Sequence, residues 1–276
     1  PDDTHQFAAL LTKEQLDRIA DKLREELTSH YGGRLIGRRP RFAALATFFP
    51  NASLPEEEEG DRRTRNLAVK ALRNSIYLAS SLGCHCVEIV GGAGVPGPNY
   101  KGTHSLDDYR ALRHNALAKT LYEVYDTSSK GDNILEELSK GKHQLPVVAV
   151  EMEPGPSFLV NSLKEFTNLR DGLYKLIGND KNRLSLESLK LNIDIAHAFL
   201  IGFKPDKLTE MNLSEDCVNF HISDHAGHWK AGGTHGSDLV PNSFHFYQDY
   251  EEWLKLAITQ MGKGKLLSNS IAVELE

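Results

Sequence analysis

Apolar residues along the chain alternate between short continuous runs and longer stretches with helical spacing. The continuous runs predict buried strands at 41–49, 86–92, 145–155, 189–197, 217–224 and 270–276. Between them apolar positions recur every three or four residues, which is typical of amphipathic helices. The predicted helices span 12–33, 61–84, 106–129, 133–141, 162–178 and 246–262, and a short helical region is expected after 197. This alternation indicates a parallel sheet covered by helices.

Two architectures fit such a pattern, a (β/α) barrel and an open doubly wound sheet. Local signals support the predicted helix boundaries. Thr12 can cap the first helix, Gln15 stands at the capping-box position, and Gly32 and Gly33 follow the helix end.

Composition narrows the class of protein. The chain has 276 residues, 40% of them hydrophobic and 25% charged, and no internal linker, which suits a single α/β domain over 1–276. The net charge of −6 argues against nucleic acid as a partner. Three cysteines make no disulfide framework and indicate a reducing, cytoplasmic setting. We expect no membrane-spanning segment and no secretory signal, and a homo-oligomer is compatible with the sequence.

The late predicted strands share one feature, a side chain that can bind metal at the point where the apolar run stops. These residues are Glu151 with Glu153, Asp194 with His197, His221 with Asp224, and Glu274 with Glu276. In a parallel barrel all strand carboxyl ends lie on one face, where active sites sit. Three carboxylates and one imidazole suit Mn²⁺, Mg²⁺, Co²⁺ or Zn²⁺. Any one acid at a strand end has a plainer interpretation as a turn or cap, but four in order favour a site.

The order Glu, Asp-x-x-His, His-x-x-Asp, Glu resembles the xylose isomerase-like TIM-barrel superfamily, which contains sugar isomerases, sugar epimerases and nucleases of the AP-endonuclease type. The resembling segments are VVAVEMEPG, LNIDIAHAF, FHISDH and SIAVE, with LASSLGCHCVEIVGG as a weaker one, and they cover most of the chain from about Leu67 onward. The resemblance implies a (β/α)8 TIM barrel. Its first strands are not evident in the given sequence, so we expect the domain to lack an N-terminal portion.

The resemblance also implies roles for residues. The metal ligands would be Glu151, Asp194, His221 and Glu274, and His197 would line the site or orient a ligand. In epimerases of this superfamily two ligand glutamates are the catalytic bases, which here correspond to Glu151 and Glu274.

Two acidic neighbours compete with these bases. Strand alternation puts Glu153 on the same side as Glu151, and Glu276 on the same side as Glu274. Glu151 is preferred because VVAVE mirrors SIAVE.

The implied chemistry is proton transfer next to a carbonyl of a small carbohydrate held on a divalent ion. Epimerisation through an enediolate and isomerisation by hydride shift both remain open. A metallo-endonuclease or phosphoesterase is less favoured, because nuclease members carry Asp-x-His after the late-strand histidine and here Asp238 is followed at that spacing by Val240. A non-catalytic metal-binding barrel also remains open.

Other signals are weaker. Gly92, Gly94 and Gly97 match G-x-G-x-x-G after a strand, but prolines interrupt the segment and no helix opens directly, so a loop at the barrel mouth fits better than a dinucleotide site. His104 in this loop could reach substrate, although a surface position is the plainer interpretation. Trp229, in a histidine-rich loop, could stack on a sugar ring or anchor the loop.

Overall fold

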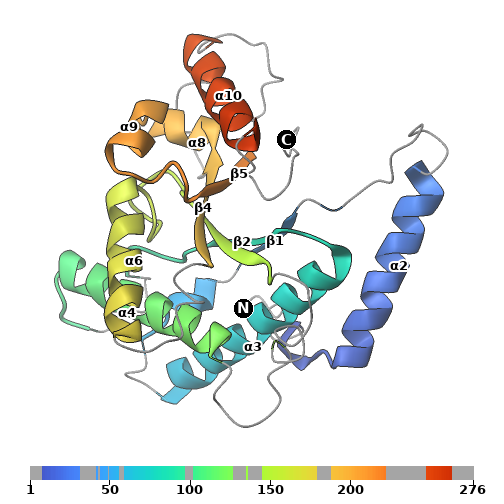
Figure 1. Cartoon of the computed structure of the whole chain (residues 1–276). Coiled ribbons are helices and arrows are strands. Elements are labelled where there is room, and N and C mark those ends of the chain that lie inside the picture. The colour runs from blue at the N-terminus through green and yellow to red at the C-terminus, as the bar shows by residue number, and fades with distance from the viewer. Residues whose placement is uncertain are drawn as a thin grey trace, which may run out of the picture.

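The computed structural model describes residues 8–31, 42, 44–48, 50–55, 59–96, 102–126, 135, 145–178, 188–221 and 247–262. The strands in these ranges are β1 (Ala44–Phe48), β2 (Cys86–Val90), β3 (Val147–Glu151), β4 (Leu189–Asp194) and β5 (Cys217–His221) (Figure 1). The helices are α2 (Lys13–Tyr31), the 3-10 helix η1 (Pro50–Ser53), α3 (Glu59–Leu82), α4 (Leu106–Tyr125), α6 (Leu163–Ile177), α8 (Ile195–Leu200), α9 (Pro205–Glu210) and α10 (Tyr247–Gly262).

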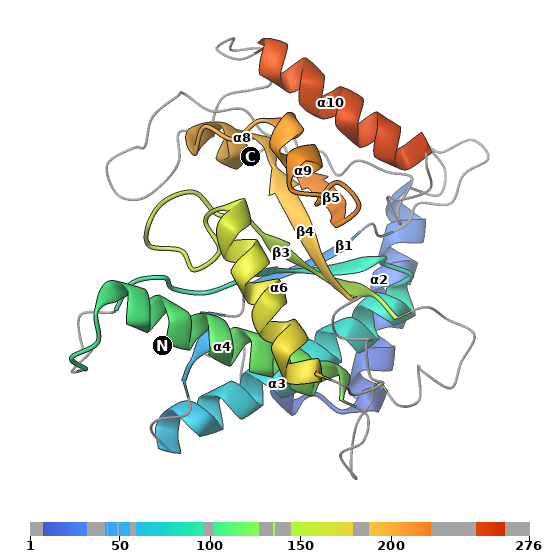
Figure 2. The same cartoon turned by 60° about the vertical axis from the view of Figure 1, so that its left-hand side comes forward.

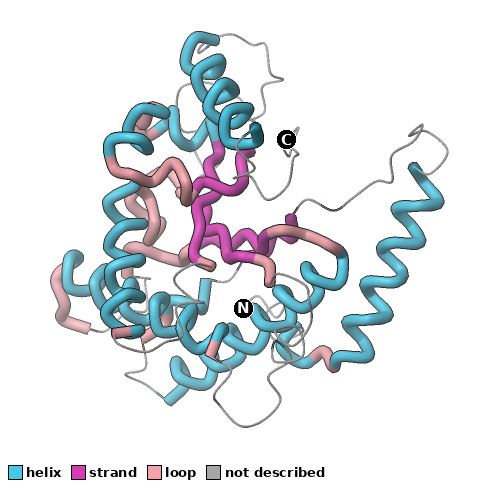
Figure 3. The backbone as a smooth tube through the Cα atoms, in the orientation of Figure 1, coloured by secondary structure: helices cyan, strands magenta, loops and turns pink. Residues whose placement is uncertain are grey.

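The five strands form one parallel sheet in which spatial order equals sequence order, β1-β2-β3-β4-β5. Helices alternate with the strands along the chain and lie around the sheet (Figure 3). A doubly wound sheet reverses its strand order at a switch point, whereas a barrel adds each strand beside the previous one. The described strands show no reversal, so their order is that of a barrel.

The two faces of the sheet differ in chemistry. Helices α3, α4 and α6 pack on one face (Figures 1 and 2), where they bury apolar residues at helical spacing such as Leu72, Ile76, Leu121 and Leu173. The other face carries a separate small cluster that includes Cys86, Val147, Ala149 and Val218. Toward the carboxyl ends of the strands, this second face becomes polar.

An irregularity in β5 sets which side chains reach the polar face. Leu191 pairs with Cys217, but Asn192 pairs with Asn219, so Val218 is an extra residue in β5. Bulges of this kind re-aim the side chains that follow. Asp194 then pairs with His221, and paired residues in a parallel sheet point to the same face.

Trp253 anchors the last described helix. Its side chain on α10 is 1% exposed and meets Phe203 and Phe220 edge-on, with ring centroids 5.2 and 6.4 Å away. Because Phe220 belongs to β5, this contact ties α10 to the last described strand.

The helix cap predicted at the start of α2 is confirmed. The amide of Thr12 donates to Gln15 Oε1 (2.8 Å) and the amide of Gln15 donates to Thr12 Oγ1 (3.4 Å), which is the expected capping box. All three cysteines are free and buried. No helix in the described ranges is long and apolar enough to cross a membrane.

Two strand ends are predicted wrongly, and the first is that of the strand expected over 145–155, which ends at Glu151. The strand expected over 189–197 ends at Asp194, and α8 begins at Ile195. The reason is local, because Asp194 Oδ1 accepts a hydrogen bond from the His197 amide at 3.0 Å, as a helix-capping residue does. The predicted strand 270–276 lies outside the described residues, as does the helix 133–141 apart from Leu135.

Candidate metal centre

Three of the residues expected at strand ends converge. Glu151, Asp194 and His221 are the last residues of β3, β4 and β5, and all three are buried. The Nδ1 atom of His221 lies 3.5 Å from Glu151 Oε1 and 4.0 Å from Asp194 Oδ2. The predicted convergence at the carboxyl edge of the sheet is therefore present for these three positions.

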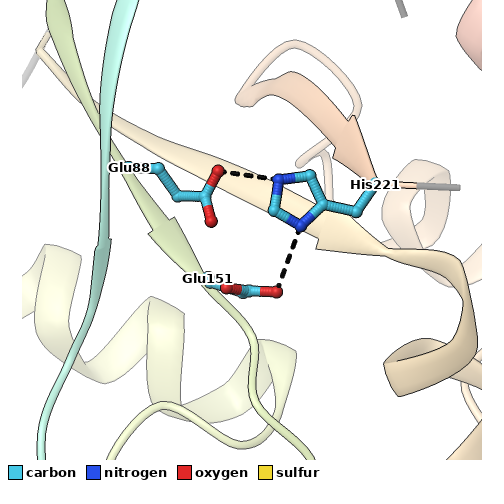
Figure 4. Close-up of side chains that lie close together, drawn as sticks. All are labelled: Glu88, Glu151 and His221. Atoms are coloured by element: carbon cyan, nitrogen blue, oxygen red, sulfur yellow. Dashed lines mark ion pairs between the residues drawn. The ribbon is translucent and has the colours of Figure 1, made fainter. Parts of the chain in front are cut away.

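A fourth acid, Glu88, joins the cluster from β2. Its Oε2 atom lies 2.8 Å from His221 Nε2, so the imidazole stands between Glu88 and Glu151 (Figure 4). One ligand atom from each of Glu88, Glu151 and His221 lies within 4.8 Å of the others. Asn219 adds a hydrogen bond from its Nδ2 to Glu88 Oε2 at 3.2 Å.

His197 brings Glu153 to the same region. From the first turn of α8, its Nδ1 lies 3.4 Å from Glu151 Oε1 and 3.6 Å from Glu153 Oε2. Glu151 therefore faces both imidazoles through one oxygen atom. Among the described residues, the buried Oε2 of Glu153 has no hydrogen-bond partner. Glu151 and Glu153 both belong to the cluster, so their positions alone do not decide which of the two would bind a metal ion.

Burial and mutual contact shift the pKa values of both imidazoles. Burial alone would lower the pKa of His221, but contacts with Glu151 and Glu88 raise it to about 11. Burial likewise opposes protonation of His197, and Glu151, Asp194 and Glu153 raise its pKa to about 9. The cluster without an ion therefore holds protons on both rings.

The carboxyls shift in opposite directions. Burial raises the pKa of Glu88 to about 7, although His221 opposes the shift. Burial together with the charge of Glu151 raises the pKa of Glu153 to about 7. Burial would also raise the pKa of Glu151, but contacts with His197 and His221 outweigh it and hold that pKa well below its usual range. Of Glu88, Glu151 and Glu153, Glu151 is thus the most firmly ionised.

The donor set fits a divalent cation. Four buried or nearly buried carboxyls face two imidazoles, and the Oε2 atom of Glu153 is left without a hydrogen bond. Isolated buried carboxylates are costly unless a cation or proton neutralises them. Mixed oxygen and nitrogen donors suit Mn²⁺, Co²⁺ or Zn²⁺.

Two loops that follow strands are tied together beside the cluster. Ala93 and Phe158 form an antiparallel bridge, the Gly94 amide donates to Ser157 O at 2.7 Å, and the Leu159 amide donates to Gly92 O at 2.8 Å. A Cβ atom at Gly94 would overlap the Phe158 carbonyl and the guanidinium of Arg110.

These contacts explain two of the glycines in the G-x-G-x-x-G match. Gly92 adopts a φ of 94°, and Gly94 allows a close approach of two loops. Helix α4 begins only at Leu106, so the glycines do not open a helix as a dinucleotide site requires. The expectation of a loop rather than a dinucleotide fingerprint agrees with this arrangement.

The remaining sequence candidates lie elsewhere. His104 is exposed in the segment before α4 and is not part of either described metal-capable group. Asp224, Trp229, Glu274 and Glu276 lie outside the described residues, so their roles stay predictions.

Sequence reasoning missed three polar residues of the site, namely Glu88, Asn192 and Asn219. All three stand inside strands rather than at strand ends, where the sequence pattern predicts ligands. The available signal was an acid or amide in the middle of an apolar run, as in CVEIV and CVNFH. A buried polar residue inside such a strand needs a partner, and here the partners are each other and His221.

This chain is similar to known proteins in its structure and not in its sequence. No known family model matches the sequence, and no curated protein matches it.

Three solved structures match most of the chain. A protein assigned as a sugar phosphate isomerase/epimerase from Anabaena variabilis matches with a TM-score of 0.53 and 16% identity, covering 95% of this chain and 68% of that one. A D-tagatose 3-epimerase-like protein gives 0.52 and 16%, covering 91% and 73%. The 3-keto-D-glucoside 4-epimerase of E. coli, in its apo form, gives 0.50 and 12%, covering 88% and 74%.

These likenesses establish the fold. They support the predicted (β/α)8 class, with which the parallel sheet and its surrounding helices agree. The described sheet supplies five consecutive parallel strands of that barrel.

Proposed function

We propose that this chain is a metal-dependent isomerase or epimerase of a sugar, sugar phosphate or related polyol. The observation that carries the proposal is the convergence of Glu151, Asp194 and His221 at the carboxyl ends of three adjacent strands. The similar solved structures named as epimerases support the same reaction class. Residues 1–276 would act as one domain.

The ion would be held by Glu151, Asp194 and His221, with Glu274 as the fourth ligand. A bound divalent cation supplies polarisation of a carbonyl and so acidifies the proton on the neighbouring carbon. Glu151 would take that proton, with its carboxylate oriented by His197, whose Nδ1 lies 3.4 Å from Oε1. Glu274 would return a proton to the opposite face of the same carbon.

His197 would orient Glu151 and contact substrate oxygens. Its ring lies 3.4 Å from Glu151, and its place on α8 is fixed by the cap that Asp194 supplies. Glu153 would complete the wall of the substrate site next to His197. These positions supply the charged groups that a polyol substrate needs for orientation.

Turnover in deuterated water tests the proposal. Metal-loaded protein would be incubated with a panel of ketoses, aldoses and their phosphates, and products and C–H exchange would be followed by NMR. Proton transfer introduces deuterium at the reacting carbon, whereas a hydride shift does not. Glu151→Gln should abolish turnover while Glu153→Gln retains part of it. The absence of both product and exchange across the panel would contradict the proposed reaction class.

A further inference from the structure

The imidazole of His221 meets different carboxyl groups on its two nitrogens. Nε2 lies 2.8 Å from Glu88 Oε2, while Nδ1 faces Glu151 Oε1 at 3.5 Å and Asp194 Oδ2 at 4.0 Å. The two nitrogens of an imidazole point away from each other. An ion bound at one nitrogen therefore cannot also bind an oxygen that is hydrogen-bonded to the other.

Strand register tells which nitrogen faces the mouth of the barrel. Glu88 is the central residue of β2 and pairs with Ala149, two residues before Glu151 in β3. Glu88 therefore lies deeper in the sheet than Glu151 and Asp194, which end their strands. The Nδ1 side of His221 faces the carboxyl edge, and the Nε2 side faces inward.

The inner side holds Glu88 in one orientation. Asn219, two residues before His221, donates from Nδ2 to the same Glu88 oxygen at 3.2 Å. Asn192 Nδ2 lies 3.4 Å from both ring nitrogens of His221 and so does not favour either one. Among these contacts, Glu88 is the group that distinguishes Nε2 from Nδ1.

We infer that Glu88 is a positioning residue that accepts the Nε2–H of neutral His221 and so directs the Nδ1 lone pair toward a cation at Glu151 and Asp194. The inference rests on the metal site of the proposed function. Carboxylate partners fix the tautomer and orientation of metal-bound histidines, and their loss typically lowers metal affinity about 10–100-fold. Glu88 itself would not be a ligand, despite its proximity.

Zinc affinity tests this role without any substrate. Glu88→Gln should weaken Zn²⁺ binding about 10–100-fold in a competition titration, with an unchanged circular dichroism spectrum. Glu165→Gln is the matched control, since it removes a carboxylate that contacts another buried imidazole, His114, at 2.6 Å outside the cluster. Equal losses in the two variants would mean that charge alone matters, and an unchanged affinity in Glu88→Gln would also overturn the inference.

Nitrogen NMR of the unaltered protein gives an independent readout. With ¹⁵N-histidine and Zn²⁺ bound, the signals of His221, assigned by their loss in His221→Gln, should show a proton on Nε2 and zinc on Nδ1. Zinc on Nε2 would overturn the role of Glu88 even if the metal site is real. Failure of the unaltered protein to bind Zn²⁺ would instead remove the metal site, and the proposed function and this inference with it.

Discussion

The guanidinium of Arg110 on α4 should stabilise the loop that follows β3, the strand that ends at Glu151. Its Nη1 donates to the carbonyls of Gly94 and Phe158, each at 3.2 Å, and its Nη2 donates to the Leu159 carbonyl at 2.7 Å. Nη2 also lies 3.4 Å from Glu165 Oε1 on α6. These contacts hold the segment after Glu153 against the loop after β2. The variant Arg110→Met tests them, because it keeps an unbranched aliphatic side chain and removes the charged guanidinium.

The magnitude follows from the geometry. The hydrogen bonds of Nη1 are shared among several acceptors at 3.2–3.3 Å, so together they count as one good bond, and the bond from Nη2 at 2.7 Å counts as a second. Hydrogen bonds from a charged donor contribute about 1.5–3 kcal/mol each. Because the side chain of Arg110 is 13% exposed and water can replace part of this, we expect a loss of about 3 kcal/mol, or a fall in Tm of roughly 6–12 °C.

Urea unfolding and hydrogen exchange measure this effect. Arg110→Met should lower the free energy of unfolding and increase exchange of the amides of Gly94 and Leu159, which bond across the two loops. Arg110→Lys keeps the positive charge but lacks the planar set of N–H donors of the guanidinium. It should therefore recover less than half of the lost free energy of unfolding. An unchanged unfolding midpoint and unchanged exchange in Arg110→Met would refute the structural role given to this side chain.

Three further predictions concern the loop contact, the helix layer and pH. Gly94→Ala should destabilise the protein by at least about 1 kcal/mol in urea unfolding, because the new Cβ overlaps two groups; an unchanged midpoint would show that the loops separate at little cost. Trp253→Ala should cost about 3–5 kcal/mol, since it removes a fully buried ring, whereas a loss below about 1 kcal/mol would show that α10 contributes little to stability. Burial lowers the pKa of His114 beside Glu165, so the unfolded chain binds the proton more tightly and His114 should reduce stability as pH falls below about 6.5. His114→Gln should lessen that loss between pH 8 and 5.5, and identical pH profiles for the two proteins would count against it.

The alternation of strands and helices could be predicted from the sequence, because apolar residues follow a different spacing in each kind of element. Helix α2 begins where Thr12 and Gln15 predict it, through local hydrogen bonds that depend on neighbouring residues only. The end of β4 was misplaced because Ile195 and Ala196 continue the apolar run. The capping bond from the His197 amide to Asp194 decides the boundary there, and an apolar pattern does not encode that bond.

The candidate site was predictable only in its outer part. Glu151, Asp194 and His221 follow from the rule that parallel strands end on one face. Glu88 could not be assigned in the same way, because its partner His221 is more than a hundred residues away and the contact depends on register. The extra residue Val218, which sets the facing of Asn219 and His221, appears only once β4 and β5 are paired.

Metal content of the purified protein tests the central claim most directly. The unaltered chain, reloaded with Zn²⁺ or Mn²⁺, should hold one divalent ion at the strand ends, and Asp194→Ala should lose it. Asp194→Asn is the structural control, since its amide oxygen can still accept the hydrogen bond from the His197 amide that begins α8. One ion per chain, lost in Asp194→Ala while Asp194→Asn stays folded, is the predicted result. Full occupancy in Asp194→Ala, or no bound ion in the unaltered chain after reloading, would contradict the account.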